Sequence, residues 1–353
     1  MKKLLLKLAV LCALVFGTLF AIILLPGPQN TYVQAILDKH QRLMETAAPR
    51  LVLVGGSNLA FGIDSEMLQN GLGMLVVNTG LHAGFGLGRM LDDVAPFLQS
   101  GDTLVIAPEY SHFTSEWDGG LAAWDLVSDT RNFSLLISDT FIGPEYQRLV
   151  DSWNSDSGAE LASDTRSLFL GTTLYGLPSA FPEYARGKLL ALLPRPLTPL
   201  AYTRDGFNEY GDYIKHFSVE NQPITPNQPL DPLNPKYLAR FFQFVAAFTG
   251  SGIRVILTYP SYEEVSFYNM VNRIHELDAL IREREDLTVI SIPEDYCFPA
   301  AFFYDTVYHL NEHGRAIRSE QLLHDLLASG LFPLEALSEN HKLSHTLTPL
   351  GDE

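Results

Sequence analysis

Beyond residue 30, short apolar runs alternate with segments whose apolar positions recur at helical spacing. The apolar runs predict strands at 50–55, 74–78, 102–107, 253–258 and 287–291. The segments between and around them predict helices at 31–46, 64–70, 86–99, 235–249, 263–284 and 312–328. Because strands that alternate with helices form parallel sheets, this rhythm predicts an α/β fold with helices on both faces of a central parallel sheet.

The first 28 residues follow a different pattern. Lys2 and Lys3 precede an apolar run of 18 residues over 8–25, which is long enough to cross a bilayer with some thinning. The positive flank predicts that the bulk of the chain lies outside the cytoplasm. No good cleavage site follows, so a retained signal anchor is favoured over a cleaved signal peptide. We therefore predict a transmembrane anchor over 1–28 and an extracytoplasmic domain over 29–353.

The stretch from about 111 to 230 interrupts the alternation of strands and helices. It is rich in aromatic residues and in turns that contain proline and glycine. A stretch of this length is too long for an ordinary loop. We predict an insertion or cap with short helices of its own.

Composition and charge narrow the class of protein. The 353 residues are 46% hydrophobic, which is ample for a packed core, and carry a net charge of 24 − 41 = −17. Residues 1–29 hold three lysines and no acid, so the remainder carries 21 − 41 = −20. Such a surface repels polyanions and argues against a nucleic-acid partner. Cys297 is the only cysteine beyond the apolar run, so no intrachain disulfide forms in the exported part.

A serine follows the first predicted strand. The apolar run 52–54 leads into Gly55, Gly56, Ser57 and Asn58. The glycines allow a sharp turn and a close backbone approach, and the serine then lies at the carboxyl edge of the sheet, where open α/β folds place their sites. A simple turn or a phosphate-contacting loop explains the same string.

An acid and an imidazole precede the last predicted helix. Asp305 and His309 stand four residues apart, and Asn311 is a candidate N-cap for the helix. A loop can turn Asp305 back onto His309, which fixes the tautomer of the ring while its other nitrogen faces Ser57. The plainer interpretation is a surface acid and a histidine in the last loop.

Together these two sites resemble the SGNH/GDSL hydrolase superfamily. Residues 55–58 match the first conserved block, 78–84 resemble the second, and Asp305 with His309 matches the last, with one residue more between them than is usual. The resemblance covers about 50–110 and 250–328. It implies a three-layer, flavodoxin-like fold and a catalytic set of Ser57, His309 and Asp305, with no metal and no other cofactor.

The resemblance also implies an oxyanion hole. Its donors are expected to be the amides of Ser57 and of Gly80 or Gly84, with a contribution from Asn58. The third block departs from the family pattern, because the third strand runs into Glu109 where an asparagine donor is expected. Loss of one such donor costs roughly 100-fold to 1000-fold in rate.

The altered third block also occurs in membrane-tethered SGNH-like proteins that modify cell-envelope polymers. The chain resembles the accessory proteins of polysaccharide O-acetylation and of D-alanyl transfer to teichoic acids. This branch implies a serine esterase or O-acyltransferase at the bacterial inner membrane, which acts on an acylated glycan or another envelope polymer. A membrane-bound O-acyltransferase is the implied protein partner.

Two other functions stay open. The first is a catalytically weak or inactive SGNH-like scaffold or glycan-binding subunit of an envelope-assembly complex, with aromatic side chains that stack on sugars. Its candidate residues are Trp117, Trp124 and Trp153. The second is a hydrolase of phospholipid acyl chains, which only the nearness to the membrane favours.

Several polar and aromatic residues are weaker candidates for a substrate pocket. They follow core strands or lie in a polar turn of the insertion, and they are Glu109, Tyr110, Tyr259, Asn208 and Asp212. His82 and His112 also follow strands, but their spacing matches no zinc signature, so we expect no catalytic metal.

Overall fold

A computed structural model describes residues 2–23, 30–115, 117, 202–229 and 231–332. Five parallel strands form its central sheet, in the order β2-β1-β3-β4-β6. They are β1 (Leu51–Gly55), β2 (Val76–Asn78), β3 (Thr103–Ala107), β4 (Arg254–Leu257) and β6 (Thr288–Val289). This strand order agrees with a flavodoxin-like fold, so the predicted α/β class with a central parallel sheet is confirmed.

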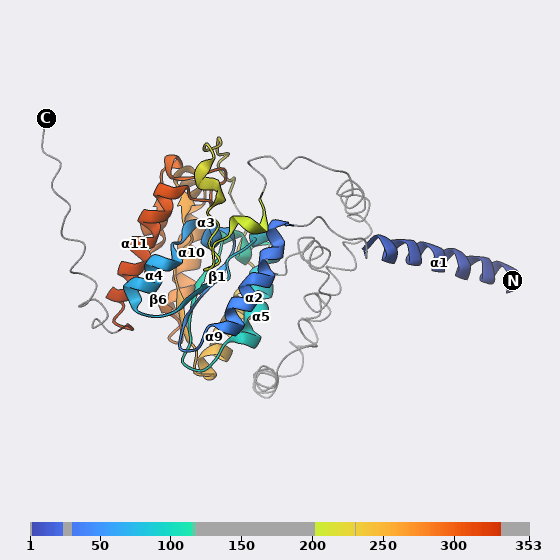
Figure 1. Cartoon of the computed structure of the whole chain (residues 1–353), viewed down its shortest axis with the longest axis horizontal. Coiled ribbons are helices and arrows are strands. Elements are labelled where there is room, and N and C mark those ends of the chain that lie inside the picture. The colour runs from blue at the N-terminus through green and yellow to red at the C-terminus, as the bar shows by residue number, and fades with distance from the viewer. Residues whose placement is uncertain (1, 24–29, 116, 118–201, 230, 333–353) are drawn as a thin grey trace, which may run out of the picture.

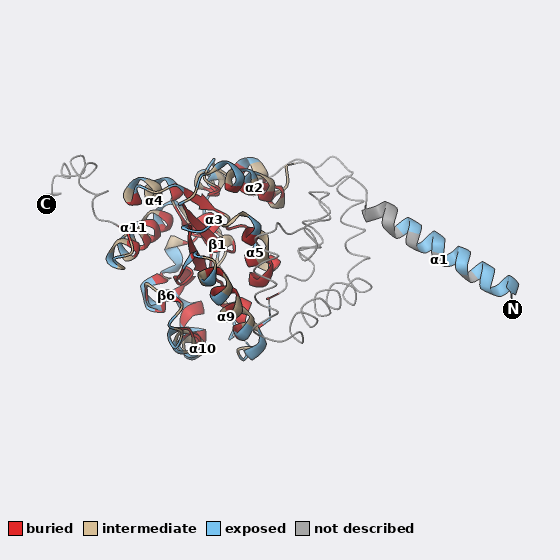
Figure 2. Cartoon of the chain, turned by 90° about the horizontal axis from the view of Figure 1, so that it is seen from below, coloured by how far each residue is buried: buried red, intermediate tan, exposed pale blue. Residues whose placement is uncertain are grey.

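Helices cover both faces of the sheet (Figure 1). Alternate residues of β1 serve different faces, since Val52 and Val54 belong to one apolar core and Leu51 and Leu53 to the other. The first core includes residues of α2 (Ala35–Glu45), α5 (Leu87–Val94), α9 (Pro235–Gly250) and α10 (Glu264–Arg282). The second includes residues of α3 (Ser57–Gly62), α4 (Ser65–Leu72) and α11 (Glu312–Ala328). Figure 2 shows the buried strands between these layers.

The predicted strands and helices correspond to these elements, with two additions. The short helix α3 and a second sheet of β5 (Tyr262–Glu263) and β7 (Cys297–Phe298) were not predicted. Both are too short to produce a periodic apolar pattern. The predicted N-cap is confirmed, because the Asn311 side chain accepts a hydrogen bond of 3.0 Å from the Gly314 amide.

The N-terminal segment forms helix α1 (Lys2–Ile23), whose described leucines are exposed (Figure 2). No helix within the described ranges is both long and apolar enough to cross a membrane. Residues 24–28, at the end of the predicted anchor, lie outside the description.

Most of the predicted insertion, residues 118–201, lies outside the described residues. The part that follows, residues 202–219, packs on the domain and is called the strap here. It contains two 3₁₀ helices, Arg204–Gly206 and Lys215–Ser218. Its Thr203 forms a β-bridge with Thr31, and its Tyr213 amide donates to the Ala60 carbonyl of α3 at 2.7 Å.

Candidate active site

The turn after β1 places Ser57 at the carboxyl edge of the sheet. Gly55 pairs with Ala107 of β3, so Ser57 and Glu109, each two residues further on, emerge side by side. A Cβ atom on Gly55 would lie 2.5 Å from the Ala107 carbonyl oxygen, and one on Gly56 would lie 2.5 Å from Glu109 Oε1 and 3.0 Å from Ala83 Cα. Ser57 begins α3 and is partly exposed. The two glycines therefore bring the serine and the carboxylate together.

Glu109 is the hydrogen-bond partner of Ser57. The Ser57 hydroxyl donates to Glu109 Oε1 at 3.4 Å, and the Asn58 amide donates to the same oxygen at 3.3 Å. Glu109 is buried, with 4% of its surface exposed. The sequence suggested Glu109 only as a pocket residue. The structure places its carboxylate directly against the candidate nucleophile.

Asp305 turns back onto His309, as the sequence predicted. Asp305 Oδ1 lies 2.8 Å from His309 Nδ1. The loop is held closed by its backbone, since the Tyr304 amide donates to the His309 carbonyl at 2.7 Å. Burial opposes the ionised form of Asp305, but the hydrogen bond and the charge of His309 outweigh it and lower the pKa of this carboxyl group. Asp305 is therefore an ionised acceptor at neutral pH.

The Asp305–His309 pair lies against the helix that Ser57 begins. The His309 ring stacks on Phe61 of α3, with centroids 4.0 Å apart and planes 7° apart. No hydrogen bond joins Ser57 to His309 in the structure, and both residues are described. Because Phe61 is one helical turn beyond Ser57, all three predicted catalytic residues lie at the same end of the sheet. The serine hydroxyl is turned towards Glu109 instead of His309.

Tyr202, at the start of the strap, belongs to the site and was not predicted. Its hydroxyl donates to Asp305 Oδ2 and lies 3.2 Å from His309 Nδ1. Tyr202 is separated from Asp305 by 103 positions in the chain. It stands in a segment with no periodic pattern, so no signal in the sequence could have identified this contact.

Three of the four predicted oxyanion donors already have partners within the protein. The Gly80 amide donates to Asn78 Oδ1 at 2.9 Å, and the Gly84 amide donates to His82 Nδ1 at 2.9 Å. The side chain of Asn58 is buried and donates to the Ala107 carbonyl at 3.1 Å. To serve as an oxyanion donor, each of these three groups would have to leave its present partner, so their role stays a prediction.

Two of the predicted pocket residues are buried among aromatic and polar side chains. Tyr110 is 3% exposed and packs edge-on against Tyr262, with ring centroids 5.3 Å apart. Tyr259 is 2% exposed, and its hydroxyl donates to Asp278 of α10. Both side chains are part of the packed core, and their place in a substrate pocket stays a prediction.

Asn208 and Asp212 anchor the strap through contacts within the protein. Asp212 is fully buried and accepts hydrogen bonds from the Ser65 hydroxyl at 2.6 Å and from Arg315 at 3.2 Å. Asn208 accepts from the Asp212 amide at 2.9 Å and so closes a turn. Lys39 donates to the Gly211 carbonyl at 2.6 Å. The polar turn predicted as a substrate loop is therefore attached to the domain through its buried residues Gly211 and Asp212.

The other sequence candidates also have structural roles or lie outside the description. His112 accepts from the Glu109 amide at Nδ1 and contacts the Ala83 carbonyl at Nε2, each at 3.1 Å. Among the described residues, no three His, Cys, Asp or Glu side chains are arranged to hold a metal ion. Trp117 is buried against Tyr237, which contradicts its predicted role as a sugar platform. The other two tryptophans, Trp124 and Trp153, are not described.

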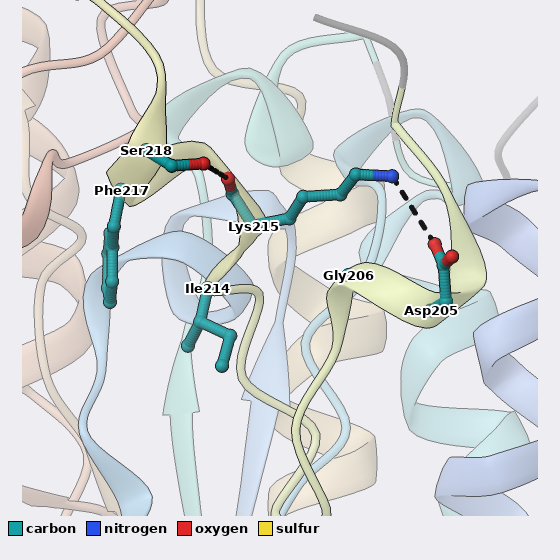
Figure 3. Close-up of a pocket in the computed structure, with 6 residues that line it drawn as sticks. All are labelled: Asp205, Gly206, Ile214, Lys215, Phe217 and Ser218. Carbon is teal, nitrogen blue, oxygen red and sulfur yellow. Dashed lines mark hydrogen bonds and ion pairs between the residues drawn. The ribbon is translucent and has the colours of Figure 1, made fainter. Parts of the chain in front are cut away.

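A hollow of about 390 Å³ lies on the strap (Figure 3). The Lys215 ammonium group points across it towards the Asp205 carboxylate, at 3.4 Å. Neither Ser57 nor His309 lines it. Its lining residues are Asp205, Gly206, Ile214, Lys215, Phe217 and Ser218. This hollow is therefore separate from the candidate active site.

Comparison with known proteins does not assign this chain to a family. The chain matches no model of a known protein family. It also has no significant match among curated proteins.

Proposed function

We propose that this protein is a serine esterase or O-acyltransferase of the SGNH type. Ser57 is the nucleophile, His309 is the general base, and Asp305 orients His309. The observation that carries the proposal is the stacking of His309 on the helix of Ser57, combined with the 2.8 Å contact between Asp305 and His309. A histidine oriented by a carboxylate beside a serine is the arrangement that activates a hydroxyl group.

The proposed reaction proceeds through an acyl-enzyme. The Ser57 hydroxyl turns from Glu109 towards His309 Nε2, which makes no hydrogen bond with the described residues. Ser57 Oγ attacks the ester carbonyl carbon while its proton passes to Nε2. The bond to the leaving oxygen then breaks, and that oxygen takes the proton from His309. Water or a sugar hydroxyl releases the acyl group by the same steps in reverse order. Asp305 stays ionised throughout, consistent with its lowered pKa.

We propose an acylated glycan or another polymer of the cell envelope as the substrate. The support is the sequence resemblance to envelope-modifying SGNH-like proteins, together with the acidic charge of residues 30–353, which favours a neutral substrate over a polyanion. Attachment of residues 1–28 to the inner membrane and partnership with a membrane-bound O-acyltransferase belong to the same proposal. Both are supported by the sequence pattern alone.

The test uses the full chain in detergent with a fluorescent serine-reactive phosphonate and with p-nitrophenyl acetate. We expect labelling and turnover in the wild type, neither with Ser57→Ala, and both strongly reduced with His309→Gln. The exposed Ser100 offers a matched control, because Ser100→Ala leaves the site untouched. Labelling that persists in Ser57→Ala contradicts the assignment. Transfer of a labelled acetyl group to an oligosaccharide distinguishes a transferase from an esterase.

A second function, the catalytically weak scaffold or glycan-binding subunit, is favoured by specific contacts. The amides of Gly80 and Gly84 already have partners, and the buried Glu109 carboxylate holds the Ser57 hydroxyl. Both features oppose an oxyanion beside Ser57. This function predicts that the wild type and Ser57→Ala bind an envelope polysaccharide equally well and that neither turns over an ester.

A further inference from the structure

The strap places a tyrosine hydroxyl against the Asp305–His309 pair. The Tyr202 hydroxyl donates to Asp305 Oδ2, while Asp305 Oδ1 lies 2.8 Å from His309 Nδ1. Each carboxylate oxygen of Asp305 therefore has its own partner. A carboxylate held at both oxygens cannot rotate about its terminal bond without loss of a hydrogen bond.

The Tyr202 hydroxyl is a permanent donor. Burial, followed by the hydrogen bond and the charge of Asp305, raises the pKa of Tyr202 far above its usual range. The hydroxyl therefore keeps its proton over the whole pH range in which the enzyme is expected to work. The groups that influence the charge of Asp305 are His309, Tyr202 and His216.

The Tyr202 ring is held independently of its hydroxyl group. It lies 5.4 Å from the ring of Phe61 and 5.5 Å from that of Tyr32. It also meets Tyr213 of the same strap at 5.7 Å. These contacts persist when the hydroxyl is removed, so Tyr202→Phe separates positioning from packing.

We propose that Tyr202 is a positioning residue, whose hydroxyl fixes the plane of Asp305 and thereby keeps the proton of neutral His309 on Nδ1. This inference rests on the proposed serine chemistry, because Nε2 must be unprotonated to accept the proton of Ser57. It also assigns a role to the strap, which carries Tyr202 over the site. Attachment of the strap by Asp212 and Lys39 then becomes a condition for an oriented histidine.

The test is nuclear magnetic resonance on the full chain, which requires no turnover. Carbon-13 in aspartate carboxyl groups follows the titration of Asp305, and nitrogen-15 in histidine reports the tautomer of His309. The signals are assigned with Asp305→Asn and His309→Gln. We expect the Nδ1–H tautomer in the wild type. In Tyr202→Phe we expect a rise of about one unit in the pKa of Asp305 and a mixture of tautomers, because the hydrogen bond that stabilises the carboxylate is lost.

Tyr213→Phe is the matched control. It removes a hydroxyl from the same strap and the same aromatic cluster, but this hydroxyl contacts neither Asp305 nor His309. We expect it to leave both titrations as in the wild type. An Asp305 titration and a His309 tautomer that are identical in the wild type and in Tyr202→Phe would overturn the proposal. So would a wild type in which neutral His309 carries its proton on Nε2, whether or not the variants fold.

Kinetics provide the second readout. Turnover of p-nitrophenyl acetate by Tyr202→Phe is expected to show a kcat about tenfold lower at an unchanged KM, because the orientation of the base is impaired and binding is not. Failure of the proposed function appears separately, as absence of phosphonate labelling at Ser57 in the wild type. That result leaves the Asp305 and His309 spectra free to support or contradict the role of Tyr202.

Discussion

The imidazole of His309 lies nearly parallel to the ring of Phe61, with centroids 4.0 Å apart. Phe61 is one turn beyond Ser57 in α3, so a single short helix carries both the candidate nucleophile and the surface on which the candidate base rests. The relative position of the two catalytic candidates therefore depends on an apolar contact. Their hydrogen bond is expected to form only when the serine hydroxyl leaves Glu109.

Replacement of Phe61 by leucine tests this dependence. Phe61→Leu removes the flat surface under the imidazole and leaves a cavity in a fully buried position. We expect the free energy of unfolding to fall by about 1–3 kcal/mol and phosphonate labelling of Ser57 to slow about tenfold. Urea denaturation and labelling kinetics measure the two effects. The control is Phe248, a buried residue of α9. We expect Phe248→Leu to lower the free energy of unfolding without slowing the labelling of Ser57. Equal labelling by both variants contradicts the role of the stack.

Glu109→Gln tests the effect of a carboxylate beside the nucleophile. The negative charge, 3.4 Å from Ser57 Oγ, disfavours the negative charge that develops in the transition state. A glutamine retains an acceptor for the Asn58 amide without that charge. We expect phosphonate labelling about tenfold faster than in the wild type. The exposed Glu276→Gln serves as control. Slower labelling would instead mean that Glu109 assists Ser57.

Asp212→Asn tests the attachment of the strap. The change removes the negative charge that faces Arg315. It also replaces one carboxylate oxygen, a hydrogen-bond acceptor, by an NH2 group, which is a donor. Burial lowers the pKa of Lys39 to about 7. The charge of Asp212 is the largest influence that raises this pKa, so the loss of that charge disfavours the charged form of Lys39. We expect a loss of about 3 kcal/mol of unfolding free energy and faster hydrogen exchange of amides 203–218.

The control for this variant is Asp205→Asn, on the same strap but with a side chain that is 63% exposed. We expect Asp205→Asn to change neither the free energy of unfolding nor the hydrogen exchange of amides 203–218. If the strap amides of Asp212→Asn exchange as slowly as those of the wild type, other contacts hold the strap.

His216 predicts a pH dependence of stability. Burial is the main cause that lowers the pKa of His216 to about 4, whereas an unfolded histidine has a pKa of about 6.5. As the pH falls, the unfolded chain therefore takes up this proton first. Neutral His216 contributes roughly 3 kcal/mol to the free energy of unfolding. This contribution is fully present above about pH 6.5 and is lost as the pH falls from about 6.5 to about 4.

Urea denaturation at pH 7.5 and 4.5 measures this effect as the difference between the wild type and His216→Gln. We expect the wild type to lose more stability on acidification than the variant does. His275→Gln removes a histidine with a half-exposed side chain and is expected to behave like the wild type. An equal loss in the wild type and in His216→Gln shows that other groups dominate.

The sequence alone determined the elements and much of their order. Apolar periodicity reports which residues of a segment face a core, and that property is local. The strands at 50–55 and 102–107 were therefore predicted close to their observed bounds. Asp305 and His309 were predicted to pair because four residues of chain can bring them together. Two glycines after a strand similarly indicated the turn that exposes Ser57.

Only the tertiary structure decided which distant residues complete the site. Tyr202 meets Asp305 across 103 positions, and Lys39 meets Gly211 across 172. Such contacts depend on packing among elements and leave no periodic pattern in the chain. The same packing buries Tyr110, Tyr259 and Asp212. Their positions in the sequence, at a strand end or in a polar turn, do not show whether a side chain is buried or lines an open pocket. Local periodicity thus encodes the elements, whereas the contacts between remote side chains emerge only when those elements pack together.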